Sequence, residues 1–188
     1  MRSPVGIFTC QPPQPEALPL RLLLLRHAKS SWEHPGLSDH DRPLSDRGRR
    51  AARAMARTLA AEGLHLDAVL TSSALRARTT CENVLAPLGP EPEVTVELYM
   101  ASPREMLELV REQGPDVARL AVVGHNPGME NLAMALAGPG SNPKALARLR
   151  GKFPTAAMAE FEFDADGWAE VARGAGRLTR FIRPKDLA

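Results

Sequence analysis

The stretch LLLLRH, residues Leu22 to His27, decides how the rest of this 188-residue chain is interpreted. Four consecutive leucines are typical of a short strand that is buried on both faces of a parallel sheet. Ligands of open α/β sheets bind at the carboxyl ends of the strands, and this is where Arg26 and His27 stand. The arginine suits phosphate because its planar fork binds two oxygens, and histidine can be a nucleophile or an acid-base group. Taken alone, the motif also fits a strand that simply ends in two polar residues.

The composition indicates a globular protein and excludes several function classes. Hydrophobic residues make up 44% and charged residues 24% of the chain, and the net charge of +2 is too small to indicate nucleic acid or an anionic membrane as partner. Aromatic residues at 4% argue against base stacking. Two cysteines, Cys10 and Cys81, are too few for a disulfide framework and favour a reducing, cytoplasmic location. No apolar run approaches the roughly 18 residues of a membrane helix.

The first 19 residues are expected to be a flexible extension. They contain five prolines, which oppose both sheet pairing and helix propagation. The apolar segment Val5 to Cys10 is shorter than the roughly seven residues that a signal peptide needs. We therefore expect residues 1–19 to precede a single folded domain at 20–188. A mis-assigned start codon would give the same pattern.

Strand and helix patterns alternate along the rest of the chain. We expect strands at Leu22–Leu25, Leu66–Leu70, Val94–Leu98, Leu120–Val123, Ala156–Phe163 and Gly176–Ile182. Helices are expected from an N-cap at Ser45 to about Glu62, over Ala74–Leu85, from an N-cap at Ser102 to Gly114, and from an N-cap at Asn126 to Ala137. This order predicts an α/β three-layer sandwich with a mostly parallel central sheet and helices on both faces. The last two strands alternate enough to lie nearer the sheet edge.

Three apolar strands end in polar residues of matching chemistry. They are Arg26-His27, Ser72-Ser73 with Arg76, and Gly124-His125-Asn126. Parallel strands would bring these ends into one crevice, together with the N-terminal N–H groups of the following helices. Two histidines and two arginines fit phosphoryl transfer through a phosphohistidine. One histidine would attack phosphorus, and the other three side chains would neutralise the phosphoryl oxygens.

These motifs together resemble the histidine phosphatase superfamily. Arg26-His27-Ala28 with Ser30 looks like its Arg-His-Gly-x-Thr/Ser signature, and the other two strand ends look like its second and third signatures. The stretch Arg42 to Gly48 matches the approach to the first helix. The order of the motifs from about Leu20 to the C-terminus is also that of the family. The most similar branch is the small SixA-type phosphohistidine phosphatases, which have a phosphoglycerate mutase-like fold without the inserted lid.

The resemblance implies a role for each matching residue. His27 would be the phosphorylated nucleophile, with Arg26, Arg76 and His125 completing the pocket. Ser30 and Asn126 would bind phosphate. Asp39, three residues before Arg42, matches a carboxylate that SixA-type proteins keep near the pocket, and this pair would supply an acid or position the loop. The mechanism of the family needs no metal and no cofactor.

Three positions depart from the family pattern. Ala28 stands where glycine is usual, and its methyl group is tolerated if the backbone φ is negative. Thr79 replaces a glutamine of the second signature. Mutase-like members have a general-acid glutamate where this chain has Met100, and the nearby Glu97 is expected to point elsewhere.

The missing glutamate constrains the substrate. An alkoxide leaves poorly unless it is protonated, whereas the imidazole of a phosphohistidine leaves readily. We therefore expect phosphohistidine, acyl phosphates or aryl phosphates to be preferred over alkyl esters, although Asp39 or Asp41 could supply a proton. The expected partner is a phosphorylated substrate such as a phosphohistidine protein, with no nucleic acid and no membrane; the sequence leaves the oligomeric state open.

Other interpretations stay open at this point. A phosphatase of activated small molecules, or a non-catalytic module that binds phosphate or a phosphoprotein, would use the same pocket. A mutase is less favoured because the chain has little room for a lid. His34, Asp39, His40 and Asp41 could instead be metal ligands, but their spacing is irregular. Trp32 could line the site entrance or pack over the sheet.

Overall fold

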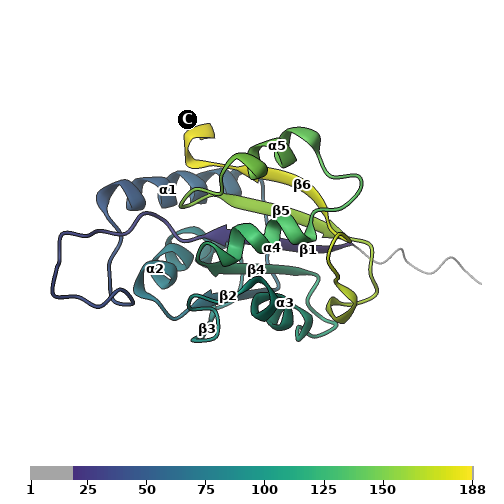
Figure 1. Cartoon of the computed structure of the whole chain (residues 1–188), viewed down its shortest axis with the longest axis horizontal. Coiled ribbons are helices and arrows are strands. Elements are labelled where there is room, and N and C mark those ends of the chain that lie inside the picture. The colour runs from purple at the N-terminus through teal and green to yellow at the C-terminus, as the bar shows by residue number, and fades with distance from the viewer. Residues whose placement is uncertain (1–18, 188) are drawn as a thin grey trace, which may run out of the picture.

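A computed structural model describes residues 19–187 and contains one six-stranded sheet (Figure 1). The strands are β1 (Leu20–Arg26), β2 (Ala68–Ser72), β3 (Glu93–Thr95), β4 (Arg119–Gly124), β5 (Met158–Phe163) and β6 (Arg177–Ile182). They lie in the order β3-β2-β4-β1-β5-β6. The first four are parallel, β5 is antiparallel to β1, and β6 is antiparallel to β5. The expected N-terminal extension lies, apart from Pro19, outside the described residues.

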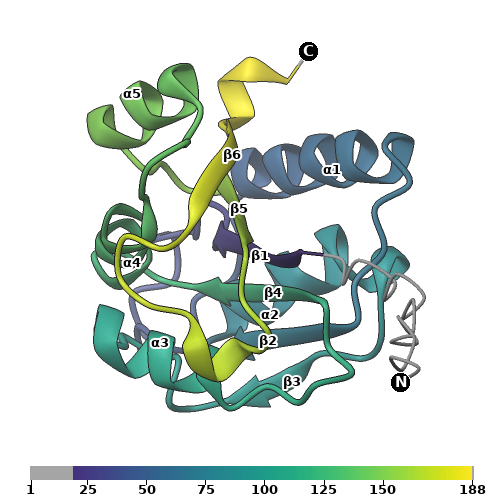
Figure 2. The same cartoon turned by 90° about the vertical axis from the view of Figure 1, so that its right-hand side faces the viewer.

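Helices cover both faces of the sheet and give the expected three layers (Figure 2). One face carries α1 (Asp46–Ala61) and α2 (Leu75–Val84), and the other carries α3 (Pro103–Arg111), α4 (Gly128–Leu136) and α5 (Pro143–Gly151). Short 3-10 turns span Ala86–Leu88, Trp168–Glu170 and Pro184–Asp186. Side chains of β1 divide between the two cores, because successive residues of a strand point to opposite faces: Leu23 and Leu25 pack toward α1 and α2, Leu22 and Leu24 toward the other three helices. The leucine run is therefore buried on both sides, as predicted.

Two glycines let helices approach the loops that follow the strand ends. A Cβ on Gly48, in the first turn of α1, would lie 2.1 Å from the carbonyl oxygen of Lys29. The same oxygen accepts hydrogen bonds from the backbone N–H (2.9 Å) and hydroxyl (3.0 Å) of Ser45, the N-cap of α1. A Cβ on Gly128, at the start of α4, would lie 2.1 Å from the carbonyl oxygen of Ala101. These contacts fix the loop after β1 and the segment before α3 against helix N-termini.

Three elements differ most from the sequence-based expectation. β3 pairs with β2 over three residues only, because the chain leaves the sheet edge in a turn closed by a hydrogen bond from Tyr99 N–H to the Val96 carbonyl (2.9 Å). α5 was not predicted, although Asn142 caps it by accepting from the N–H groups of Lys144 and Ala145. α4 begins at Gly128 with Pro127 as its N-cap, so the prediction that the Asn126 side chain caps this helix is wrong.

No helix within residues 19–187 is both long enough and apolar enough to cross a membrane.

Candidate active site

The carboxyl ends of β1, β2 and β4 bring the polar strand ends together, as the sequence predicted. Arg26 pairs in register with Gly124, and the N–H of His27 donates to the Gly124 carbonyl (3.1 Å). This pairing sets the rings of His27 and His125 side by side, with their centroids 4.9 Å apart. Both side chains are buried. The two histidines therefore face one small space at the edge of the sheet.

A backbone hydrogen bond orients His27 and fixes its tautomer. Its Nδ1 lies 2.8 Å from the carbonyl oxygen of Ala28, and because a carbonyl can only accept, Nδ1 carries the proton. The lone pair of the neutral ring is therefore on Nε2. The N–H of Ala28 in turn donates to the Thr80 hydroxyl (2.9 Å). Ala28 is fully buried and does not have a positive φ, so its methyl group is accommodated where the family has glycine.

The side chain of His125 is held at one nitrogen only. Its Nε2 lies 2.8 Å from the hydroxyl of Ser72 at the end of β2. Its Nδ1 is buried and has no hydrogen-bond partner among the described residues. The Tyr99 ring meets the imidazole edge to face, with centroids 5.6 Å apart. Because buried polar atoms normally have partners, the free Nδ1 indicates a place for a bound group.

Arg26 has a second unpartnered atom. Its Nη1 donates to the Phe153 carbonyl oxygen (2.6 Å), which anchors the guanidinium, while its Nε is buried without a partner in residues 19–187. A guanidinium N–H can only donate, so the missing partner must be an acceptor. A bound phosphoryl group would supply acceptor oxygens to both Arg26 and, when Nδ1 is protonated, His125.

Asp39 connects two further arginines. Its carboxylate accepts from Arg42 Nη1 (2.8 Å) and from Arg76 Nη2 (2.9 Å), and its backbone carbonyl accepts from Arg76 Nη1. Both guanidinium groups are buried, whereas the carboxylate is about half-exposed. Arg42 also donates to the hydroxyl of Ser30, so this predicted phosphate ligand contacts the site through Arg42. Asp39 therefore bridges two cations at the rim of the site.

Burial and the charges at the site lower the pKa of both histidines. Burial, with the nearby charges of Arg76, Arg26 and Arg42, lowers the pKa of His27 to about 4 despite its bond to the Ala28 carbonyl. Burial, with the charges of His27 and Arg76, lowers the pKa of His125 to about 3. Partial burial acts to raise the pKa of Asp39, but hydrogen bonds from Tyr99 and Arg42 and the charge of Arg76 outweigh it and lower the pKa. At neutral pH both imidazoles are neutral and Asp39 is ionised.

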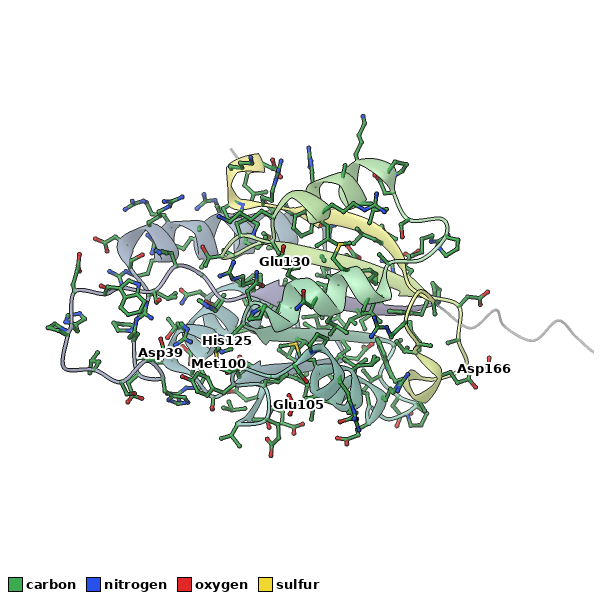
Figure 3. All side chains as sticks on the ribbon, viewed as in Figure 1. Asp39, Met100, Glu105, His125, Glu130 and Asp166 are labelled. Atoms are coloured by element: carbon green, nitrogen blue, oxygen red, sulfur yellow. The ribbon has the colours of Figure 1, made fainter. Side chains whose placement is uncertain are left out.

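Tyr99 is the site residue that the sequence analysis missed. Its hydroxyl donates to Asp39 Oδ2 (2.9 Å), and its ring contacts both His125 and His40. In the view of Figure 3 the neighbouring Met100 lies between Asp39 and Glu105. Met100, at the position where the resemblance led us to expect an acid, is more than half exposed. One signal was available: Tyr99 is the chain's only tyrosine and adjoins the position where an acid was sought.

Asn126 makes different contacts from those expected of a phosphate ligand. Its Nδ2 donates to Glu130 Oε2 (2.7 Å) and to the Phe153 carbonyl (3.2 Å). The amide therefore ties the end of β4 to α4 and to the segment that anchors Arg26. Its Oδ1 is buried without a partner in the described part of the chain.

The loop formed by residues 28–44 contains the side chains whose roles the sequence left open. Trp32 is 72% exposed, with the Arg42 guanidinium carbon 3.2 Å from its ring centroid, so it does not pack over the sheet. His40 bonds to Ser73 (2.9 Å) and to Asp41 (3.2 Å). No group of three or more histidine, cysteine, aspartate or glutamate residues within 19–187 is arranged to hold a metal ion.

Known proteins share this sequence pattern and fold. Residues 22–99 match the histidine phosphatase superfamily (branch 1). The crystal structure of a candidate phosphohistidine phosphatase SixA from Agrobacterium tumefaciens is 31% identical, with a TM-score of 0.74, over 89% of this chain and 100% of that one. This chain belongs to the histidine phosphatase superfamily, branch 1. A protein histidine phosphatase SixA complexed with tungstate is 26% identical, with a TM-score of 0.67, over 89% and 99% of the two chains. An uncharacterized protein of Mycobacterium tuberculosis is 38% identical over 162 residues, which cover 86% of this chain and all of that relative.

The lowered histidine pKa values predict how the stability of this protein depends on pH. An unfolded histidine has a pKa of about 6.5, so below that pH the unfolded chain binds more protons than the folded one. The free energy of unfolding should be highest above pH 6.5. It should fall as the pH decreases toward 5, at up to about 1.4 kcal/mol per pH unit for each of the two histidines. Urea unfolding between pH 7.5 and 5 measures this slope.

His125→Ala should reduce that slope by up to about 1.4 kcal/mol per pH unit, because one of the two buried neutral imidazoles is removed. His34→Ala removes an exposed histidine of the loop and is the control. Equal slopes for wild type and His125→Ala would contradict the buried, neutral state of His125.

Proposed function

We propose that this protein is a phosphohistidine phosphatase that acts through a phosphohistidine intermediate on His27. The observation that carries the proposal is the hydrogen bond from His27 Nδ1 to the Ala28 carbonyl, because it leaves the Nε2 lone pair free on a neutral ring. A nucleophile in this state needs no prior deprotonation. The same carbonyl stabilises the positive charge that the ring acquires when Nε2 bonds to phosphorus.

The first step transfers the phosphoryl group to His27. The Nε2 lone pair forms a bond to phosphorus while the bond from phosphorus to the leaving group breaks, and the leaving group keeps that electron pair. Arg26 and Arg76 neutralise the phosphoryl oxygens, whose charge must be stabilised in the transition state. His125 Nδ1, once protonated, donates to the same oxygens.

The second step regenerates the enzyme. Water attacks phosphorus, the P–Nε2 bond breaks, and the electron pair returns to His27. The products are inorganic phosphate and the neutral imidazole. A water proton passes to the phosphate or to the solvent, since the half-exposed Asp39 carboxylate gives water access to the rim.

The lack of a proton donor among Met100 and Asp39 favours an activated substrate, whose leaving group departs readily. Met100 cannot donate a proton, and Asp39 is ionised and occupied by Arg42, Arg76 and Tyr99. An alkyl ester therefore lacks a donor for its alkoxide, whereas a phosphohistidine already carries, or takes from water, the proton that lets imidazole leave. The likeness to SixA-type structures supports the same substrate class.

A substrate panel tests the proposal. We expect kcat/KM to decrease from a phosphohistidine peptide to phenyl phosphate to glycerol 3-phosphate. His27→Ala should lower turnover of the first two substrates by at least about 10³-fold, because the nucleophile is lost. His34→Ala, which changes an exposed histidine of the neighbouring loop, should keep wild-type rates. Faster turnover of glycerol 3-phosphate than of either activated substrate would contradict the proposal.

Asp39 is further proposed to position the two arginines rather than to donate a proton. Asp39→Asn keeps the size of the side chain but removes the charge that holds Arg42 and Arg76. It should lower kcat/KM by on the order of 10²-fold to a similar extent for all three substrates, without shifting the pH profile. Tyr99→Phe, which removes one hydrogen bond to Asp39 and keeps the ring, should cause a smaller loss of the same kind. A loss confined to glycerol 3-phosphate would identify Asp39 as the general acid instead.

A further inference from the structure

Basic residues are concentrated around α5 and the C-terminal turn. Residues 143–152 and 183–187 together contain six of the chain's 24 basic residues and one of its 22 acidic residues. The remainder of the chain has 18 basic and 21 acidic residues. Figure 2 shows α5 and the C-terminal turn, into which β6 leads, at the same end of the molecule. The near-neutral chain therefore carries a strongly positive surface at this end of the molecule.

A groove of about 580 Å³ lies within this surface. Its lining includes four cations, Arg148, Lys152, Arg183 and Lys185, and two apolar side chains, Ala147 and Pro154. We call it the basic groove. Asp186 pairs with Arg183 (2.8 Å) and with Arg148 (3.6 Å). Lys152 and Lys185 are exposed and make no ion pair with any residue in the range 19–187. The groove therefore keeps a net positive charge.

The basic groove lies at the same end of the sheet as the active site, where the parallel strands have their carboxyl ends. β6 runs in the direction of β1, because β5 is antiparallel to both. Leu25 pairs with Met158, and Met158 pairs with Ile182, so the end of β6 is level with the end of β1. Two strand spacings separate them by roughly 10 Å. The groove and the phosphate pocket therefore lie toward the same end of the sheet, where one macromolecule can contact both.

A direct connection joins the groove to the phosphate pocket. Lys152 and Pro154 flank Phe153, whose carbonyl oxygen accepts from Arg26 Nη1 (2.6 Å) and Asn126 Nδ2 (3.2 Å). The Phe153 ring is buried against Phe181 of β6, with centroids 5.0 Å apart. The segment that anchors an arginine of the site thus also forms a wall of the groove.

Helix stability explains only part of this charge. Cations in the last turn of a helix interact favourably with its macrodipole, which accounts for Arg148 and Arg150 at the end of α5. Arg183 comes from a different segment, and its ion pair with Asp186 accounts for its charge. Lys185 has no ion pair within residues 19–187 and lies outside α5, so its convergence with Lys152 on one groove needs another explanation.

We propose that the basic groove docks an acidic surface of the protein substrate, next to its phosphorylated residue. This inference rests on the proposed function and names the partner chemistry of the same site. Charge complementarity identifies the partner: exposed lysines attract carboxylates, and Ala147 and Pro154 offer apolar contact to a protein surface. A nucleic acid is disfavoured because the lining has no aromatic side chain on which a base could stack.

The test uses two synthetic phosphohistidine peptides with identical lengths, one flanked by glutamates and one by glutamines. At low ionic strength the wild-type enzyme should hydrolyse the glutamate peptide with a kcat/KM on the order of tenfold higher. The preference should decrease as salt is added, because the groove is exposed to solvent. Phenyl phosphate, which is too small to reach the groove, is the reference substrate.

Charge reversal locates the effect. Lys152→Glu and Lys185→Glu, each alone, should remove most of the preference for the glutamate peptide and leave phenyl phosphate turnover within about twofold of wild type. Lys152→Glu could act indirectly, because Lys152 adjoins Phe153, which anchors Arg26. Lys185 is on another segment, so Lys185→Glu does not share this indirect route. Arg173→Glu is the matched control, because residue 173 lies between β5 and β6 at the opposite edge of the sheet. Equal effects of all three substitutions, or no preference in the wild type, would overturn the proposal.

Binding measurements separate this proposal from the proposed function. The His27→Ala protein should bind a fluorescent glutamate peptide without phosphate more tightly than its glutamine counterpart, and Lys185→Glu should abolish the difference. If the phosphohistidine peptides are not hydrolysed but this binding difference is found, the proposed function fails and the docking surface stands. Tighter binding of a single-stranded oligonucleotide than of the glutamate peptide would identify the groove as a nucleic-acid site and overturn the proposal.

Discussion

The site contains more buried positive charge than buried negative charge. Its chemistry depends on this imbalance. Arg42 and Arg76 share one half-exposed carboxylate, Asp39, and Arg26 relies on a backbone carbonyl. Burial, together with the excess of positive charge, keeps His27 and His125 neutral. It also leaves Arg26 Nε and His125 Nδ1 without partners in residues 19–187. A phosphoryl group would relieve these conditions, since it supplies negative charge and acceptor oxygens at once.

Backbone carbonyls hold the nucleophile and Arg26 in place. The carbonyl of Ala28 orients the nucleophile, and that of Phe153 anchors Arg26. Carbonyls of Lys29 and Ala101 sit against the helix starts at Gly48 and Gly128, where any Cβ would collide with them. Because backbone positions are set by the packed sheet and helices, the fold itself determines the geometry of the phosphate pocket. Exposed side chains such as Trp32 and Met100 do not have to fit this backbone geometry.

The features that could be predicted are those set by local patterns in the sequence. The leucine strand, the N-caps at Ser45 and Ser102, and the convergence of His27 and His125 follow from periodicity and from the rule for parallel strands. Contacts between distant segments were not predictable in this way. Tyr99 reaches Asp39 across sixty positions of sequence, and Phe153 reaches Arg26 across 127. Asn126 was expected to be an N-cap because a proline follows it. The helix starts two residues later, at Gly128, and the side-chain amide of Asn126 binds Glu130 and Phe153.

The central claim is that His27 Nε2 becomes covalently phosphorylated, and trapping that species tests it most directly. The enzyme should be mixed with a phosphohistidine peptide, quenched in alkali within milliseconds, and examined by mass spectrometry. The account predicts a phosphate on His27 that is stable to base and labile to acid, absent from His27→Ala and present in His34→Ala. Rapid hydrolysis with phosphate found on no residue, or on His125 in place of His27, would contradict it.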